Sequence, residues 1–250
     1  MITNYHRPKT LDEALTLLTQ PNTLPLGGGT LLSHGSTDSV QAVDLQLLGL
    51  NSLTKSGNNL ELGATLTLQA LLESEHCPEA LKSALKLEAP LNIRNTATVA
   101  GTLIACDGRS TFASVLLAMD SKIVISSKQN EEEIIKIGDL LPLREQVRGK
   151  LITMIIVPEN VKLAFEYVSK TPADKPLVCA AVAQWNSGRT RLALGGYGKS
   201  PMLGMDGTEA MGIEAAAQNT FHEAKDEYAS AEYRMDVAAT LAKRCLEGLG

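Results

Sequence analysis

The stretch LPLGGGTLLSHGS, residues 24–36, places three consecutive glycines and a threonine directly after a short apolar run. A glycine in regular structure costs about 0.5–1 kcal/mol relative to alanine, because its backbone loses more freedom on folding. Such a cluster indicates backbone that turns tightly or is approached closely. Consecutive main-chain N–H groups in a turn of small residues also bind phosphate oxygens. The glycines by themselves leave both interpretations open, a packed turn and a phosphate-binding loop.

A second stretch, IRNTATVAGT at residues 93–102, has the same character, with small and hydroxyl-bearing residues and a single charge. Neither stretch is a Walker A loop, because GxxxxGK[ST] is absent, and neither has the G-x-G-x-x-G fingerprint of a Rossmann fold. Two loops of this kind in one domain would suit the two ends of a pyrophosphate. They are the candidate binding loops of this sequence.

The chain around the two loops reads as a mixed α/β region followed by a β region and helices. The motif TLDE at residues 10–13 is a capping box and predicts a helix start. Strands are expected before residue 160 at 23–26, 42–45, 60–64, 122–126 and 151–157, and after it at 163–169, 177–185 and 190–196. A last amphipathic helix is expected over 229–246. We therefore predict a domain boundary near residue 160, with helices on one face of a three-stranded antiparallel sheet beyond it.

Composition excludes several classes of function. The 250 residues carry a formal net charge of −5, which argues against a nucleic-acid binder. No apolar run approaches the roughly 20 residues that cross a bilayer, and the N-terminus lacks the apolar core of a signal peptide. We therefore expect no membrane insertion and a cytoplasmic location. The four cysteines and four histidines show no ligand spacing, so no metal site and no catalytic cluster is predicted.

The order of several segments carries a family resemblance. LPLGGGTLL, LELGATLTLQALL, IRNTATVAGTL and STFASVLLAMDSKIVI are followed by AFEYVSKTPADKPLVCAAVAQW and AEYRMDVAATLAKRCL. Taken together, this set resembles the FAD-binding medium subunit of the molybdenum hydroxylases, a family that includes the carbon monoxide dehydrogenase medium subunit and the flavin domain of xanthine dehydrogenase. The resemblance covers nearly the whole chain in the right order.

The resemblance implies an α+β fold of the vanillyl-alcohol-oxidase type, also called the PCMH type. Its FAD-binding domain would span residues 1–160, with α/β subdomains at about 1–55 and 56–160. A domain like the C-terminal domain of the carbon monoxide dehydrogenase flavoprotein would follow at 161–250. FAD is the cofactor that this fold implies.

The family's binding positions carry over to named residues. The residues that the resemblance assigns to FAD are Gly27, Gly28, Gly29, Thr30 and Leu31 in the first loop, and Thr98, Val99, Ala100, Gly101 and Thr102 in the second. Asp107 or Ser110 is expected to replace, from a displaced position, the acidic group that the family has in the next loop. Lys170 falls where the family has a basic residue near the flavin, and a solvated lysine at a strand end is the alternative. Four positions depart from the family's pattern. Ala100 stands for a glycine, Thr102 for an asparagine, Gly108 for a proline and Thr111 for an acidic residue.

The function that the resemblance implies is electron transfer. FAD would accept electrons from a [2Fe–2S] small subunit, itself reduced by a molybdopterin-binding large subunit, and pass them to NAD⁺ or another acceptor. The four departures support an alternative, a scaffold homologue that keeps the fold without the flavin. A third reading, an FAD oxidase that acts alone, fits less well, because no histidine is convincingly placed for covalent flavin attachment and no cap domain of the expected size is present.

Overall fold

The structure is a computed structural model that describes residues 1–32, 39–129 and 132–250. The chain forms two compact units. The first unit comprises Met1–Glu73, Leu91–Ala105 and Lys122–Val157. The second comprises Ser74–Pro90, Cys106–Ser121 and Pro158–Gly250. Two short segments that precede residue 160 thus belong with the C-terminal part, and the predicted division into domains 1–160 and 161–250 stays a prediction.

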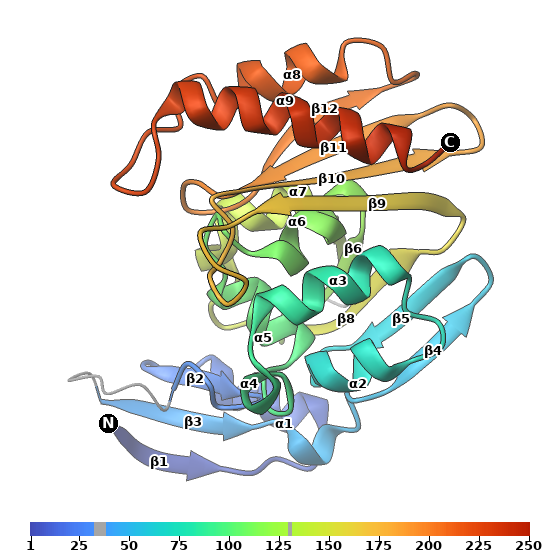
Figure 1. The fold of residues 1–250 in the computed structure, drawn as a ribbon. Coiled ribbons are helices and arrows are strands. Elements are labelled where there is room, and N and C mark those ends of the chain that lie inside the picture. The colour runs from blue at the N-terminus through green and yellow to red at the C-terminus, as the bar shows by residue number, and fades with distance from the viewer. Residues whose placement is uncertain (33–38, 130–131) are drawn as a thin grey trace. The chain divides into compact units, whose positions relative to one another are not determined.

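A parallel three-stranded sheet opens the first unit, with strand order β1-β3-β2 (Figure 1). The strands are β1 (Ile2–His6), β2 (Thr23–Leu26) and β3 (Val40–Asp44), and helix α1 (Leu11–Leu18) joins β1 to β2. The predicted capping box begins α1, since the Thr10 hydroxyl accepts a hydrogen bond from the Glu13 amide at 3.2 Å. The apolar face of α1 packs on buried residues of β3 and its neighbours, as expected from its helical period.

The second sheet of this unit has five strands in the order β4-β5-β8-β6-β7. Its strands are β4 (Leu53–Ser56), β5 (Asn59–Gly63), β6 (Lys122–Ser126), β7 (Glu133–Lys136) and β8 (Leu151–Pro158). The helices of the unit are α2 (Leu68–Glu73), α4 (Leu91–Arg94), α5 (Val99–Ala105) and α7 (Ile137–Leu140), with 3₁₀ helices at Gln46–Leu48 and Leu141–Val147. The expected strands of this region are all present.

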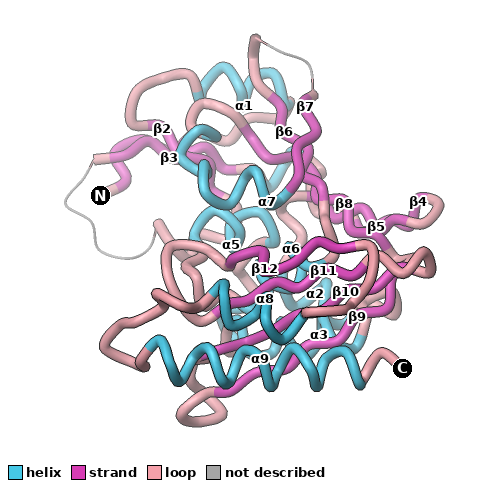
Figure 2. The backbone as a smooth tube through the Cα atoms, turned by 90° about the horizontal axis from the view of Figure 1, so that it is seen from above, coloured by secondary structure: helices cyan, strands magenta, loops and turns pink. Residues whose placement is uncertain are grey.

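The second unit is built on an antiparallel sheet in the order β12-β11-β10-β9. Its strands are β9 (Val161–Val168), β10 (Val178–Trp185), β11 (Thr190–Gly195) and β12 (Met202–Gly207). Helices α8 (Ile213–Thr220) and α9 (Ala231–Glu247) lie side by side over one face (Figure 2). Helices α3 (Glu79–Glu88) and α6 (Thr111–Ala118) contact the sheet from its other side (Figure 1).

Two details of the predicted C-terminal sheet were wrong. It has four strands rather than three, because β12 contains two glycines and lacks the β-branched pattern that predicts a strand. Helices cover both faces rather than one, since α3 and α6 come from earlier in the chain. This double cover explains why six consecutive residues of β10 are buried. No helix in the described ranges is long and apolar enough to cross a membrane.

Candidate functional site

The first glycine loop follows β2 in the first unit. Strand β2 runs parallel to β3, with Leu26 opposite Asp44, and the chain then enters Gly27. Gly29 has φ +72°, a left-handed conformation that favours glycine. Among the described residues, the amides of Gly27 and Gly28 have no hydrogen-bond acceptor. The turn therefore leaves main-chain donors available for an anion.

The second loop leads into α5 and uses its amides differently. The Val99 amide donates to the Leu66 carbonyl at 2.9 Å, and the Ala100 amide donates to the Ala64 carbonyl at 3.2 Å. These bonds fix the start of α5 against the segment after β5. Ala100 is helical and buried, so its methyl group lies in protein packing rather than in a left-handed turn. Alanine in place of the family's glycine is thus compatible with the local backbone at residue 100.

Thr98 organises the end of this loop with its own side chain. Its hydroxyl oxygen accepts a hydrogen bond from the Gly101 amide at 3.1 Å. The Thr98 carbonyl accepts from the amide of Thr102 at 2.9 Å and from its hydroxyl at 2.8 Å. All four amides from Val99 to Thr102 therefore donate within the protein, and the second loop is not the open array of donors that its sequence suggests.

The two loops touch each other through their backbones. A Cβ atom on Gly28 would overlap the carbonyl oxygen of Thr96, and one on Gly27 would lie 2.9 Å from the Thr98 hydroxyl oxygen. Glycine at these positions lets one loop lie against the other. The physical reason for glycine at residue 28 therefore differs from the expected one. Neighbouring main chain, rather than a ligand, occupies the space that a side chain would need.

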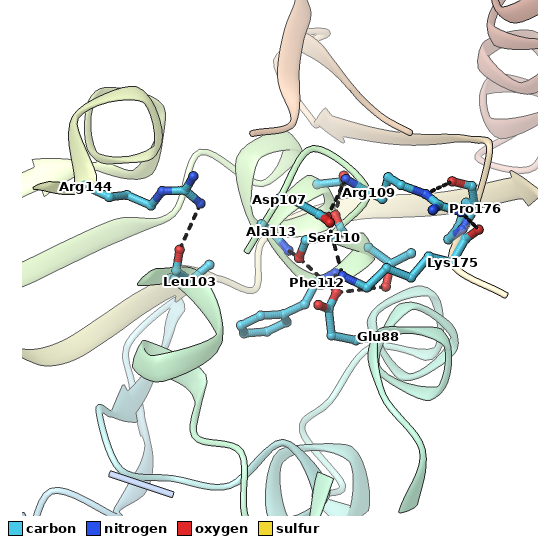
Figure 3. A network of polar contacts seen from close by, with 12 residues as sticks. Glu88, Leu103, Asp107, Arg109, Ser110, Phe112, Ala113, Arg144, Lys175 and Pro176 are labelled. Atoms are coloured by element: carbon cyan, nitrogen blue, oxygen red, sulfur yellow. Dashed lines mark hydrogen bonds and ion pairs between the residues drawn. The ribbon is translucent and has the colours of Figure 1, made fainter. Parts of the chain in front are cut away.

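The remaining predicted positions lie in the second unit, and two of them, Asp107 and Ser110, are labelled in Figure 3. Asp107 accepts a hydrogen bond from the Arg109 amide at 2.9 Å and pairs with Lys175 at 3.4 Å. Ser110 is fully buried and caps α6 by accepting from the Ala113 amide at 3.1 Å. Lys170 is exposed and lies after β9. The predicted residues therefore divide between the units, and those in the second unit include one, Ser110, whose hydroxyl is already engaged.

Glu88 is a polar residue of this network that sequence analysis missed. One of its carboxylate oxygens accepts from the Ser110 hydroxyl at 2.8 Å, the Thr111 hydroxyl at 3.2 Å and the Phe112 amide at 2.9 Å. It thus supplies negative charge at the N-terminus of α6, where the helix dipole favours it. The signal in the sequence was weak, since Glu88 simply ends an amphipathic helix. The carboxylate at the start of α6 thus comes from α3, an earlier segment of the chain.

Gly108 explains another departure from the family's pattern. Its amide donates to the Gly198 carbonyl at 2.9 Å, and its carbonyl accepts from the Gly196 amide at 2.7 Å. A Cβ atom at this position would overlap the carbonyl of Tyr197. A proline here would lose the first bond and collide with the facing main chain.

Cys179 is a buried thiol of the second unit with a structural role. It lies against Ser114, and burial raises the pKa of its thiol to about 12. A thiol with this pKa stays protonated near neutrality and is a poor nucleophile and metal ligand. Within the described ranges, no group of three or more His, Cys, Asp or Glu residues is placed to hold a metal ion.

Comparison with known proteins identifies this arrangement. The family described as the FAD binding domain in molybdopterin dehydrogenase matches residues 1–160. The chain belongs to this family. The resemblance, the fold class, the cofactor FAD and the assignment to FAD-containing oxidoreductase subunits are thereby confirmed.

Individual relatives match this FAD-binding chain along most of its length. The uncharacterized protein YgfM of Escherichia coli (strain K12) is 28% identical, over 96% of this chain and 94% of the relative. The glyceraldehyde dehydrogenase medium chain of Sulfolobus acidocaldarius is 26% identical, over 81% of this chain and 78% of its own length. A chain of reconstituted CO dehydrogenase from Oligotropha carboxidovorans superposes with a TM-score of 0.82 at 22% identity, covering 98% and 96% of the two chains, which shows the shared fold.

The residues of the first unit fit an FAD diphosphate in part. The Gly27 and Gly28 amides are donors without an acceptor among the described residues. Gly101, in the second loop, is exposed. Uncommitted main-chain donors are what a pyrophosphate requires. The amides of the second loop are committed internally, so this FAD-binding chain would hold the anion mainly through its first loop. The individual contacts of the predicted residues with FAD stay predictions.

Proposed function

We propose that this chain is the flavin subunit of a molybdenum hydroxylase-type complex and transfers electrons between protein partners and a final acceptor. A [2Fe–2S] small subunit would reduce its FAD, and a molybdopterin-binding large subunit would reduce the small subunit. The final acceptor would be NAD⁺ or another oxidant. When bound, FAD supplies the redox chemistry, since it exchanges both single electrons and hydride, and the protein supplies position and electrostatics.

The observation that supports the proposal most directly is the contact of the two loops through Gly28 and Thr96. The contact holds the first loop, whose Gly27 and Gly28 amides have no acceptor among the described residues, against the start of α5. The chain in which this happens belongs to the FAD-binding family. The task left to this chain's residues is to bind and orient the cofactor. No residue is needed as a general acid or base, which agrees with the absence of a catalytic cluster in the sequence.

The experiment follows electrons through the assembled complex. The purified chain is loaded with FAD, mixed anaerobically with the reduced [2Fe–2S] subunit, and the flavin absorption bands are recorded by stopped flow. We expect the bands to bleach on mixing and to recover when the acceptor is added, with NADH formed if the acceptor is NAD⁺. FAD that stays oxidised in the presence of reduced partner would contradict the proposal.

The same preparation tests the alternative of a scaffold without flavin. The internally committed amides of the second loop and the engaged hydroxyl of Ser110 are the features that favour it. A colourless protein that also fails to take up added FAD would support the scaffold. Uptake of one FAD per chain would refute it.

A further inference from the structure

A fully buried arginine at the start of α9 belongs to neither glycine loop. Arg234 lies in the first turn of this helix, within the second unit, and none of its side chain is exposed. A buried guanidinium loses its hydration, which costs free energy unless other groups replace the lost hydrogen bonds. The groups that replace them identify the segments that Arg234 holds together.

The first of these segments connects α8 to α9 and comprises residues 224–230, which we call the strap. One terminal nitrogen of Arg234 donates to the Ala224 carbonyl at 2.7 Å and to the Ala229 carbonyl at 3.2 Å. The other terminal nitrogen donates to both carboxylate oxygens of Asp226, at 2.8 and 2.9 Å. The strap is therefore folded around the guanidinium group.

The second segment is the connection between β9 and β10, residues 169–177. The Nε atom of Arg234 donates to the Leu177 carbonyl at 3.2 Å. The Leu177 amide in turn donates to the Val168 carbonyl at 2.8 Å, which closes the base of the connection. One side chain thus joins the strap to the base of the β9–β10 connection.

Arg109 joins the same two segments a second time. Its Nε atom donates to the Pro176 carbonyl at 3.1 Å, and a second guanidinium nitrogen donates to the Lys175 carbonyl (Figure 3). Its guanidinium carbon lies 4.8 Å from the ring centre of Tyr228, which belongs to the strap. The strap and the connection are therefore held together at two points.

Tyr228 extends this arrangement to Lys170, an exposed residue of the connection. The Tyr228 amide donates to the Asp226 carboxylate at 2.9 Å, which fixes the backbone that carries the ring. The Lys170 Nζ atom lies 5.6 Å from the ring centre, within the range of cation–π attraction. The position of the Lys170 charge thus depends on Arg234 through the strap and through the base of the connection.

We propose that Arg234 is a positioning residue that acts through Tyr228 and the β9–β10 connection to fix the charge of Lys170. The inference rests on the proposed function, in which the flavin of this chain exchanges electrons with its partners, and Lys170 is predicted to lie near that flavin. A cation beside a flavin raises its reduction potential, because reduction adds negative charge to the ring. Arg234 therefore affects electron transfer only through the residues that it holds.

Hydrogen exchange of the FAD-loaded chain, measured by mass spectrometry at pH 7, tests the tether. Arg234→Lys keeps the charge but loses the fork of donors, and Asp226→Asn is the milder variant, since it keeps an oxygen for the Tyr228 amide. Each is expected to speed exchange in peptides 169–177 and 224–230 about tenfold. Arg244→Lys, at an exposed position of α9, is the matched control. Unchanged exchange in Asp226→Asn overturns the proposal, even where Arg234→Lys fails to fold.

The midpoint potential of the bound FAD is a readout that a merely structural role leaves unmoved. Lys170→Gln is expected to lower it, Asp226→Asn to lower it less, and the control Lys243→Gln, exposed on α9, to leave it unchanged. The double variant of Asp226 and Lys170 is expected to match Lys170→Gln alone, because the strap acts through Lys170. Additive shifts overturn the proposal, and so does a potential that Lys170→Gln leaves unchanged.

Failure of the proposed function is recognisable on the same samples. A chain that takes up no FAD, or whose FAD stays oxidised beside the reduced partner, contradicts electron transfer. The exchange rates of residues 169–177 are measured without either, and they decide whether Arg234 holds the connection.

Discussion

The carbonyl oxygen of Thr96 occupies the position that a Cβ atom of Gly28 would take. One glycine of the first loop is therefore specified by the main chain of the second loop. Since the two residues are far apart in the sequence, their contact also ties β2 to the start of α5 within the first unit.

Gly28→Ala is expected to separate the loops. Its methyl group overlaps main chain that cannot rotate away, so we expect a loss of about 3 kcal/mol in the free energy of unfolding. Gly29→Ala has more room and is strained only by its positive φ, which costs about 1 kcal/mol. Urea unfolding of both variants measures the difference.

FAD titration of the same variants connects this packing to the cofactor. Gly28→Ala is expected to lose most of its affinity for FAD. Gly57→Ala is the control, because Gly57 also has positive φ but has nothing within 4 Å of its Cβ position. Equal FAD affinity in Gly28→Ala and the wild type would show that the loop contact does not serve the cofactor.

Gly108→Ala tests the second close approach of backbone. Its methyl group meets the carbonyl of Tyr197, and a loss of about 3 kcal/mol is expected in thermal or urea unfolding. Gly198→Ala, with φ +82° and open space around it, is expected to cost only about 1 kcal/mol. Because Gly108 itself does not have a positive φ, similar losses in both variants would mean that the contact with Tyr197 adds no cost of its own.

Glu88 is expected to stabilise the start of α6 through its carboxylate. Glu88→Ala leaves the Phe112 amide and the Ser110 hydroxyl without their acceptor, whereas the Thr111 hydroxyl keeps its bond to the Ala84 carbonyl at 2.7 Å, and a loss of about 2–3 kcal/mol is expected. Glu88→Gln keeps an oxygen but loses the charge, for a loss of about 1 kcal/mol. Glu79→Gln on the same helix removes only an exposed ion pair with Lys82 and should leave stability unchanged. Equal unfolding free energies for Glu88→Ala and wild type would contradict this role.

Asp206 predicts a specific dependence of stability on pH. Two hydrogen bonds from Arg189, at 2.9 and 2.8 Å, and the charge of Arg191 hold the pKa of Asp206 below its usual 3.8 against the opposing effect of burial. A carboxyl with a lowered pKa contributes its full stabilisation above about pH 4 and loses it as the pH falls through the lowered value. Asp206→Asn should therefore be less stable than the wild type at pH 7, with the gap narrowing toward pH 2. A gap that stays constant between pH 7 and pH 2 would show that the ion pair contributes nothing.

Local sequence signals determined much of the first unit. The capping box at Thr10 and Glu13 fixed a helix start, because its hydrogen bonds close within four residues. Strand β6 could be predicted from its β-branched residues, and the ordered set of segments carried the family. These signals depend on neighbours in sequence, which a sequence displays directly.

Only the tertiary structure decided what the small residues do. Two contacts join backbone segments that are far apart in the sequence, Gly28 with Thr96 and Gly108 with Tyr197. No local sequence pattern encodes which carbonyl faces which glycine. The carboxylate of Glu88 likewise reaches α6 from a different helix, where it accepts a hydrogen bond from the Phe112 amide. Hydrogen bonds and van der Waals contacts act over a few ångströms in space, whatever the separation along the chain.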